Sequence, residues 1–257
     1  DKAIADYNEA IRLHPNDIDF YDNRGSTYRA LKEYDKAIAD FSKAIQLAPK
    51  EPDYYNRRGN TWNDKGEYEK AIADYDQTIR LDPQDAVYYS NRGTAWYNMS
   101  EYDKAIAEYT DAIRIDAKYA AAYNSRGNAW YAQAKYEKAI ADYDQAIRLN
   151  PDSNDFYSNR GSAWYRRAEY DKAVADYDQA IRLSPTNPTH YTDRGNTWYA
   201  IKEYDKAIAD YSVWIQLDPN NAAAYSSRGF TLRLKGDYEQ AITDFNQALK
   251  VDPKGLQ

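Results

Sequence analysis

Residues Glu137–Tyr170 read EKAIADYDQAIRLNPDSNDFYSNRGSAWYRRAEY, and this stretch of 34 residues recurs with substitutions along the whole chain. Its copies begin at Asp1, Asp35, Glu69, Asp103, Glu137, Asp171 and Asp205, and a half copy runs from Glu239 to Gln257. A fixed period of this length is typical of solenoids, in which each unit buries its apolar side against its neighbours. We therefore expect residues 1–257 to form a single solenoid rather than separate globular domains.

Each copy contains two helical patterns. Over residues 137–149 the apolar residues follow the i, i+3, i+4, i+7 spacing of an amphipathic helix, here called helix B. Pro151 ends it, because proline has no N–H to donate and clashes with the preceding turn. Asp152 or Ser153 is expected to cap a second helix, helix A, over residues 154–167. A tight turn near residues 168–170 leads into the next helix B.

This alternation predicts an all-α fold of antiparallel helix pairs, because the connections between the helices are short. The chain opens with a helix B alone, in residues 1–17. The hairpin units then cover residues 18–51, 52–85, 86–119, 120–153, 154–187, 188–221 and 222–257. Because the chain begins within a repeat, we expect it to be part of a longer protein.

The spacing Y-x2-R-G-x2-W in residues 89–96, followed by A-x3-Y in residues 105–109, resembles the tetratricopeptide repeat (TPR). The resemblance covers essentially the whole chain, as seven and a half repeats of a variant that carries Asn-Arg-Gly. It implies a right-handed α-solenoid superhelix with a concave groove lined by the A helices. It also implies a non-catalytic scaffold whose partners are proteins or peptides.

One departure from the family pattern is a charge pair. The leucine that usually precedes the helix A glycine is arginine in every copy, and an acidic residue stands sixteen residues later in helix B. We predict that each arginine forms a structural ion pair with the acid of its own hairpin unit or with that of the preceding hairpin unit, so that losing one partner costs about 3–5 kcal/mol where burial is deep. The pairs of the central copies are Arg92 with Glu108, Arg126 with Asp142, and Arg160 with Asp176. The alternative is that the arginines bind an anionic ligand.

Composition excludes several classes of function. The net charge of −7 argues against nucleic acid as the main partner, since phosphate binding depends on Lys and Arg. No apolar run approaches the roughly 18 residues of a membrane span. The chain has no cysteine, so disulfides and thiolate metal sites are excluded, and this fits a reducing compartment such as the cytoplasm.

The residues indicate no enzyme. The two histidines, His14 and His190, have no partners at the spacing of a metal site or a nucleophilic site. Every glycine inside a helix A is isolated, so no phosphate-binding loop is present. We expect no catalytic residue, no metal and no cofactor.

The groove is the predicted binding surface. Helix A positions 2, 5, 9 and 12 form a stripe at helical spacing, opposite the side that meets helix B. Together with position 6, this stripe carries polar side chains and a row of tyrosines that suit an extended peptide. The predicted groove residues are Asn91, Tyr97, Asn124, Asn128, Tyr131, Asn159, Tyr165, Asn196 and Tyr199.

Three alternatives stay open. The tyrosines of the groove could pack between adjacent A helices instead of contacting a ligand, or could stack single-stranded RNA or a glycan. The terminal helices suggest self-association: helix 1–13 has no helix A before it, and Ile4, Tyr7 and Ile11 should be partly exposed. The last helix, 239–251, has no polar capping helix after it. The chain could therefore form homo-oligomers through its ends.

Overall fold

The computed structural model describes residues 2–253, which form fifteen α-helices and, in that range, no strand. The prediction of an all-α solenoid of antiparallel helix pairs is confirmed. The chain divides into two compact units, Asp1–Gln133 and Ala134–Gln257, which are described here in turn. That the two units form one continuous solenoid stays a prediction.

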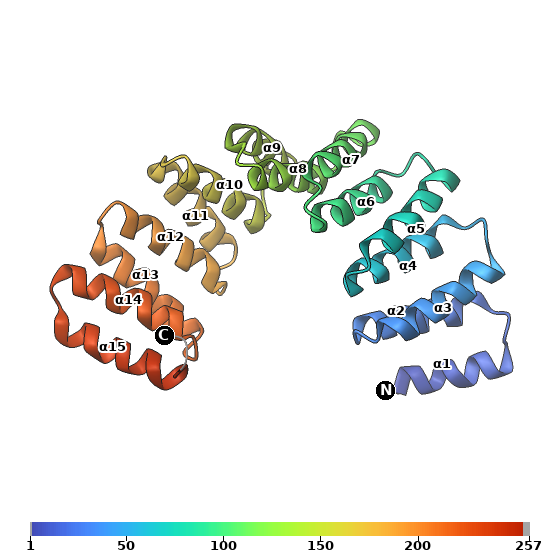
Figure 1. Ribbon diagram of the computed structural model, residues 1–257, viewed down its shortest axis with the longest axis horizontal. Coiled ribbons are helices and arrows are strands. Elements are labelled where there is room, and N and C mark those ends of the chain that lie inside the picture. The colour runs from blue at the N-terminus through green and yellow to red at the C-terminus, as the bar shows by residue number, and fades with distance from the viewer. Residues whose placement is uncertain (1, 254–257) are drawn as a thin grey trace. The chain divides into compact units, whose positions relative to one another are not determined.

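The first unit contains α1 to α8, drawn in blue and green in Figure 1. Its helices are α1 (Lys2–Leu13), α2 (Ile18–Ala30), α3 (Tyr34–Leu47), α4 (Pro52–Lys65), α5 (Tyr68–Leu81), α6 (Ala86–Asn98), α7 (Tyr102–Ile115) and α8 (Ala120–Ala132). The even-numbered helices are A helices, and α2 contacts α4, α4 contacts α6, and α6 contacts α8. The A helices of this unit thus form a row.

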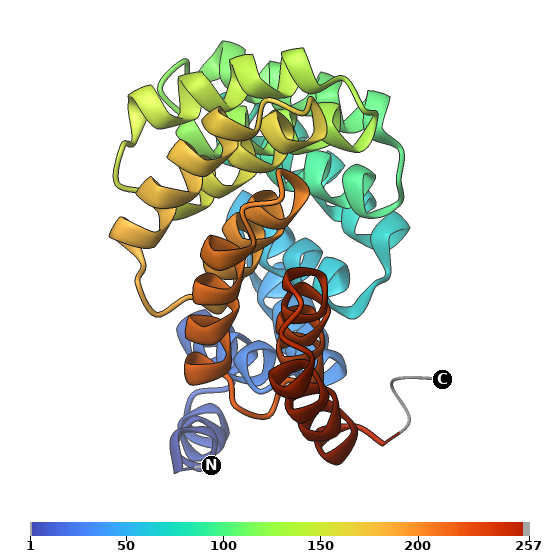
Figure 2. The same ribbon diagram turned by 90° about the vertical axis from the view of Figure 1, so that its left-hand side faces the viewer.

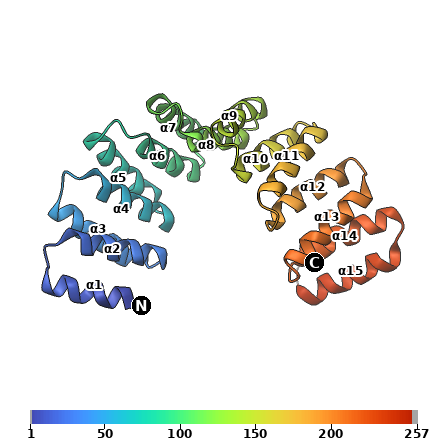
Figure 3. The same cartoon turned by 180° about the vertical axis from the view of Figure 1, so that it is seen from behind.

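The second unit contains α9 to α15. Its helices are α9 (Tyr136–Leu149), α10 (Asn154–Arg166), α11 (Tyr170–Leu183), α12 (Pro188–Ala200), α13 (Tyr204–Leu217), α14 (Ala222–Lys235) and α15 (Tyr238–Val251). Here too the A helices are the even-numbered ones, and α10 contacts α12. Figure 2 shows α12 to α15, in orange and red, as antiparallel hairpins, and Figure 3 shows the same helices from behind the view of Figure 1.

In the hairpins that lie within one unit, an aromatic ring of helix B lies against the glycine of helix A. A Cβ built on Gly195 of α12 would lie 2.8 Å from Cε1 of Tyr211 in α13, and one on Gly161 of α10 would lie 2.9 Å from Cε1 of Tyr177 in α11. The glycine is needed because the ring of helix B occupies the space where a side chain would stand. Both tyrosines are almost completely buried.

The helix ends differ in detail from the sequence prediction. Each complete helix B begins at the tyrosine one residue earlier than expected, as in α9 and α11, and α10 ends at Arg166. Ser153 takes the N-cap position of α10, but its hydroxyl makes no capping hydrogen bond. Asp85 does cap α6, because its carboxylate accepts from the N–H of Val87 at 2.8 Å.

The turn inside each hairpin needs a left-handed residue. Glycine supplies it at Gly66 and Gly236, with φ of 86° and 93°. Five other turns place a residue with a side chain there, with φ between 57° and 66°, which costs conformational energy. These residues are Lys32, Ser100, Ala134, Ala168 and Lys202.

The two terminal helices leave apolar side chains uncovered. Helix α1 buries no residue, and Ile4, Tyr7 and Ile11 are half-buried. In α15, the side chains of Tyr238 and Ile242 are 64% and 60% exposed. None of the helices in residues 2–253 has the length and apolar character that a membrane span requires.

Candidate functional site: the face of the A helices

The candidate site is the face that each row of A helices turns away from its B helices, here called the A face. It is formed by positions 2, 5, 9 and 12 of each helix A, and position 6 lies along its edge. In unit 1 the four central positions of α6 are Val87, Ser90, Thr94 and Tyr97, and in unit 2 those of α12 are Thr189, Thr192, Asn196 and Tyr199. Small and mostly polar side chains therefore occupy positions 2, 5 and 9 of these helices, and an aromatic ring occupies position 12.

The side chain at position 9 of helix A is a hydrogen-bond partner of the hydroxyl of the buried tyrosine on helix B. In α12, Oδ1 of Asn196 accepts a hydrogen bond of 2.8 Å from the Tyr211 hydroxyl, and Asn60 accepts one of 2.7 Å from Tyr75. Burial raises the pKa of both tyrosine hydroxyls, so they stay neutral donors. Where helix B carries Phe245 instead, position 9 is also apolar, and Phe230 packs on it with ring centroids 5.0 Å apart. Asn196 thus supports the hairpin as well as facing outward.

The tyrosine row at position 12 is ordered by contacts inside each hairpin. The ring of Tyr165 lies 5.5 Å from that of Tyr170, the first residue of α11, in an edge-to-face arrangement. Tyr97 contacts Tyr102 at 5.4 Å and Tyr199 contacts Tyr204 at 6.1 Å in corresponding positions. Tyr131 occupies position 12 of α8. The sequence pattern did not indicate these partners, which are the first tyrosines of the following B helices.

Position 6 of one helix A meets position 5 of the helix A before it. Nδ2 of Asn91 in α6 donates to Oδ1 of Asn56 in α4 at 2.9 Å. One step earlier, Nε of Arg57 in α4 lies 3.2 Å from Oδ1 of Asp22 in α2. Asn124 and Asn128 lie at positions 5 and 9 of α8 in unit 1, and Asn159 lies at position 6 of α10 in unit 2.

A hollow opens on the A face of unit 1 between α2 and α4. Its volume is about 260 Å³. An ion pair of 2.6 Å between Arg29 and Asp64 lies on its wall. The lining residues are Ser26, Arg29, Ala30, Phe41, Arg57 and Asp64.

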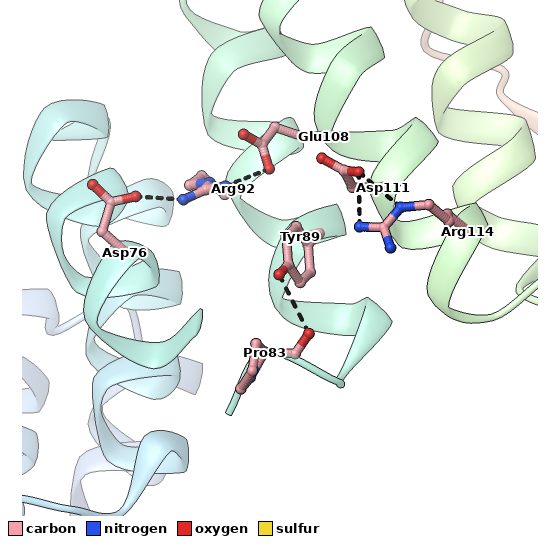
Figure 4. Close-up of polar contacts among 7 residues, drawn as sticks. All are labelled: Asp76, Pro83, Tyr89, Arg92, Glu108, Asp111 and Arg114. Carbon is pink, nitrogen blue, oxygen red and sulfur yellow. Dashed lines mark hydrogen bonds and ion pairs between the residues drawn. The ribbon is translucent and has the colours of Figure 1, made fainter. Parts of the chain in front are cut away.

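The arginine that precedes the glycine of helix A joins three helices in α6 of unit 1 and in α10 of unit 2. Arg92 of α6 places Nη2 2.8 Å from Oε2 of Glu108 in α7 and Nη1 2.6 Å from Oδ1 of Asp76 in α5 (Figure 4). The acid sixteen residues after the arginine was expected to be its partner. On the preceding helix B the partner is Asp76, sixteen residues before the arginine, and not Asp74, the recurring acid of the preceding hairpin unit.

Unit 2 repeats this arrangement. Arg160 of α10 contacts Asp176 of α11 at 2.6 Å and Asp144 of α9 at 2.5 Å. Burial raises the pKa of the Asp176 carboxyl, and the hydrogen bond from Arg160 opposes that rise. In unit 1, Nη1 of Arg126 donates to Thr110 at 3.1 Å, while Asp142 lies in unit 2. Arg92 and Arg160 thus each contact acidic side chains of two B helices within their own unit.

The tyrosines at position 4 of helix A account for some of the 28 tyrosines in the chain. The hydroxyl of Tyr89 donates to the carbonyl of Pro83 at 3.3 Å (Figure 4), and Tyr191 donates to Pro185 at 3.0 Å. These tyrosines, at position 4, thereby fasten the loop that precedes their own helix A. They are structural, which leaves position 12 as the aromatic row of the A face.

His190 belongs to the packing of α12. Its Nε2 lies 3.0 Å from Oδ1 of Asn154 and 3.1 Å from Nδ2 of Asn187, and burial lowers its pKa. Within residues 2–253, no three or more His, Cys, Asp and Glu side chains gather in a way that could hold a metal ion.

Models of the tetratricopeptide repeat match the chain from residue 21 to residue 254, with two short gaps. The matches described as "Tetratricopeptide repeat" cover residues 21–51, 90–153, 124–188 and 222–254, and those described as "TPR repeat" cover residues 59–100 and 195–233. The helix pairs of the structure have the same period. The chain belongs to the tetratricopeptide repeat family.

Solved structures with this fold include YrrB, described as a TPR protein with an unusual peptide-binding site. Its TM-score is 0.60, with 21% identity over 71% of this chain and 94% of YrrB. For PilF of Pseudomonas aeruginosa the TM-score is 0.69, with 22% identity over 80% of this chain and 93% of PilF. For yeast Tom70 the TM-score is 0.70, with 18% identity over 97% of this chain and 54% of Tom70. At these identities the likeness shows the fold. No curated protein matches this chain by sequence.

Proposed function

We propose that the chain is a non-catalytic scaffold for protein–protein interaction that binds an extended peptide along the A face. The observation that carries this proposal is the combination of half-buried amide and hydroxyl side chains with an ordered tyrosine row on the A helices. The fold supports it, because TPR proteins generally act as scaffolds, and YrrB is described as having a peptide-binding site. Neither the net charge of the chain nor the surroundings of His190 favours an enzymatic function.

The chemistry of the A face fits a peptide main chain. The hydroxyl of Ser158 can both donate and accept, so it can pair with backbone N–H and C=O groups, whereas the hydroxyl of Thr192 donates to the carbonyl of Pro188 at 3.0 Å and can still accept. The ring of Tyr199 is 39% exposed, yet it is held by Tyr204. A ring that is already ordered loses little conformational entropy when a ligand packs on it.

The test is a selection from a random peptide library on the full chain, followed by fluorescence anisotropy with the enriched peptides. We expect the Tyr165→Ala/Tyr199→Ala double variant to weaken binding at least tenfold, because both rings leave the A face of unit 2. Tyr238→Ala, in α15, removes an equally large ring from outside the A face and should leave the affinity unchanged. An absence of enriched peptides, or equal loss in both variants, would contradict the proposal.

A second candidate function is self-assembly through the terminal helices. In unit 1, Ile106 of α7 is buried against a cluster that includes Ala129 of α8, whereas Ile242, at the same position of α15, is 60% exposed. Burial of such apolar surface favours association. Light scattering after size-exclusion chromatography, over a concentration series, tests this candidate. A mass that rises with concentration and returns to that of a monomer in Ile242→Asp supports it, and a constant monomer mass rejects it.

A further inference from the structure

The carboxylate of Asp193 is the one acidic group at position 6 of any helix A. The other A helices place Asn23, Arg57, Asn91, Ser125, Asn159 and Ser227 there. In the described part of the chain, no hydrogen bond or ion pair reaches the Asp193 carboxylate. Its backbone carbonyl accepts a hydrogen bond from the Thr197 hydroxyl at 2.8 Å.

The corresponding contact in unit 1, between position 5 of one helix A and position 6 of the next, shows how an acid between two A helices is neutralised. Between α2 and α4, the acid of this pair is Asp22 at position 5 of α2, and Arg57 at position 6 of α4 lies 3.2 Å from it. Between α10 and α12, the acid is Asp193, and the residue at the facing position of α10 is Ser158. A serine cannot neutralise a carboxylate. The corresponding pair in unit 2 therefore has an acidic residue, Asp193, and no basic residue opposite it.

The ionised carboxylate of Asp193 also lowers the stability of the folded protein. Burial alone raises the pKa of Asp193 to about 6, with no neighbouring charge contributing to the shift. At neutral pH the folded chain holds an ionised and poorly solvated group that an asparagine would avoid. Groups that reduce stability in this way are common where a binding partner later compensates them.

The surroundings of Asp193 belong to the A face. Asn196 and Tyr199 lie on the same helix within two turns of it, and the Tyr165 ring lies at the C-terminal end of α10. The carboxylate of Asp155, in the first turn of α10, is exposed and adds a second negative charge to this face. Negative potential and aromatic rings together favour a basic side chain with an aliphatic stem.

We propose that the A face of unit 2 recognises a basic peptide, in which one arginine or lysine side chain forms an ion pair with Asp193 between α10 and α12. This inference rests on the proposed peptide-binding function and specifies its ligand. The peptide supplies the cation that Arg57 supplies to Asp22 in unit 1. The tyrosines at position 12 contact the aliphatic stem and the neighbouring residues of the peptide.

A double-mutant cycle on the full chain tests the ion pair. The probes are an arginine-containing peptide enriched by the selection and the same peptide with citrulline, the neutral counterpart of arginine. For the unmodified chain we expect the change to citrulline to weaken binding about tenfold, the usual effect of losing a partly desolvated charge pair. For Asp193→Asn the two peptides should bind equally. Asp171→Asn, which removes an exposed carboxylate of α11, should behave like the unmodified chain.

The outcomes separate this inference from the function on which it rests. If the enriched peptides lack basic residues, or if citrulline and arginine peptides bind the unmodified chain equally, the basic specificity is wrong and peptide binding stands. If no peptide is enriched, both fail. Loss of binding in Asp193→Asn cannot be attributed to unfolding, because this variant is expected to be more stable than the parent at neutral pH.

Discussion

Arg160 and Asp176 form a two-point ion pair between α10 and α11, in which Nε lies 2.8 Å from Oδ2 and Nη2 lies 2.6 Å from Oδ1. The carboxylate is almost completely buried, and the guanidinium keeps about a fifth of its surface. Because Nη1 also contacts Asp144, the one arginine links α9, α10 and α11. The lateral stability of the solenoid therefore depends on charges at the positions where the family usually has apolar residues.

Asp176→Ala is expected to lower the free energy of unfolding by about 2–3 kcal/mol, because the Arg160 guanidinium loses its buried partner. The loss stays near the lower end of the range for buried pairs since Asp144 remains as an acceptor. Asp144→Ala, which removes the exposed partner, should cost less than about 1 kcal/mol. Urea denaturation measures both, and equal costs would contradict the assignment of Asp176 as the main partner.

Gly195→Ala should destabilise the chain by about 1–3 kcal/mol, because the new Cβ would lie 2.8 Å from the Tyr211 ring. The control is the same substitution with Tyr211→Leu, which replaces the planar ring by a smaller side chain. Thermal denaturation of the two single variants and the double variant gives the coupling between the sites. An additive result would show that the ring does not set the requirement for glycine.

Ala168→Gly should stabilise the hairpin turn by up to about 1 kcal/mol, because Ala168 has φ of 58°, in the left-handed region. The reciprocal change is Gly236→Ala, at φ of 93°, where a Cβ meets no atom within 4 Å. It should destabilise by a similar amount through backbone strain alone. Shifts of the same sign in the two variants would contradict this explanation.

Asp193→Asn should be more stable than the parent at pH 7.5, by at most about 3 kcal/mol, and this advantage should disappear at low pH. The pKa of Asp193 is raised in the folded state from 3.8 to about 6, so the folded chain binds the proton more tightly than the unfolded chain. The favourable contribution is complete below pH 3.8 and is lost as the pH rises through 6. Urea midpoints of both proteins between pH 4 and pH 7.5 measure it, and a difference that does not change with pH would contradict it.

The sequence predicted the helix pairs because a 34-residue period and the proline and glycine positions depend on local chemistry. It also indicated that Arg92 pairs with Glu108, sixteen residues later, because the two residues lie on the sides of α6 and α7 that face each other. The contact of Arg92 with Asp76 and the ring contact of Tyr165 with Tyr170 were not predicted. These contacts depend on how a hairpin is rotated against its neighbour and on how its turn folds, and neither follows from helical periodicity.

The assignment of the A face as the binding surface is tested most directly by photo-crosslinking. An enriched peptide that carries a photoreactive phenylalanine analogue is crosslinked to the full chain, and the modified residues are identified by mass spectrometry. We predict that the modified residues lie on the A face, with Tyr165, Asn196 and Tyr199 among them for a peptide bound to unit 2. Crosslinks confined to the B helices, or to the exposed side of α15, would contradict the account.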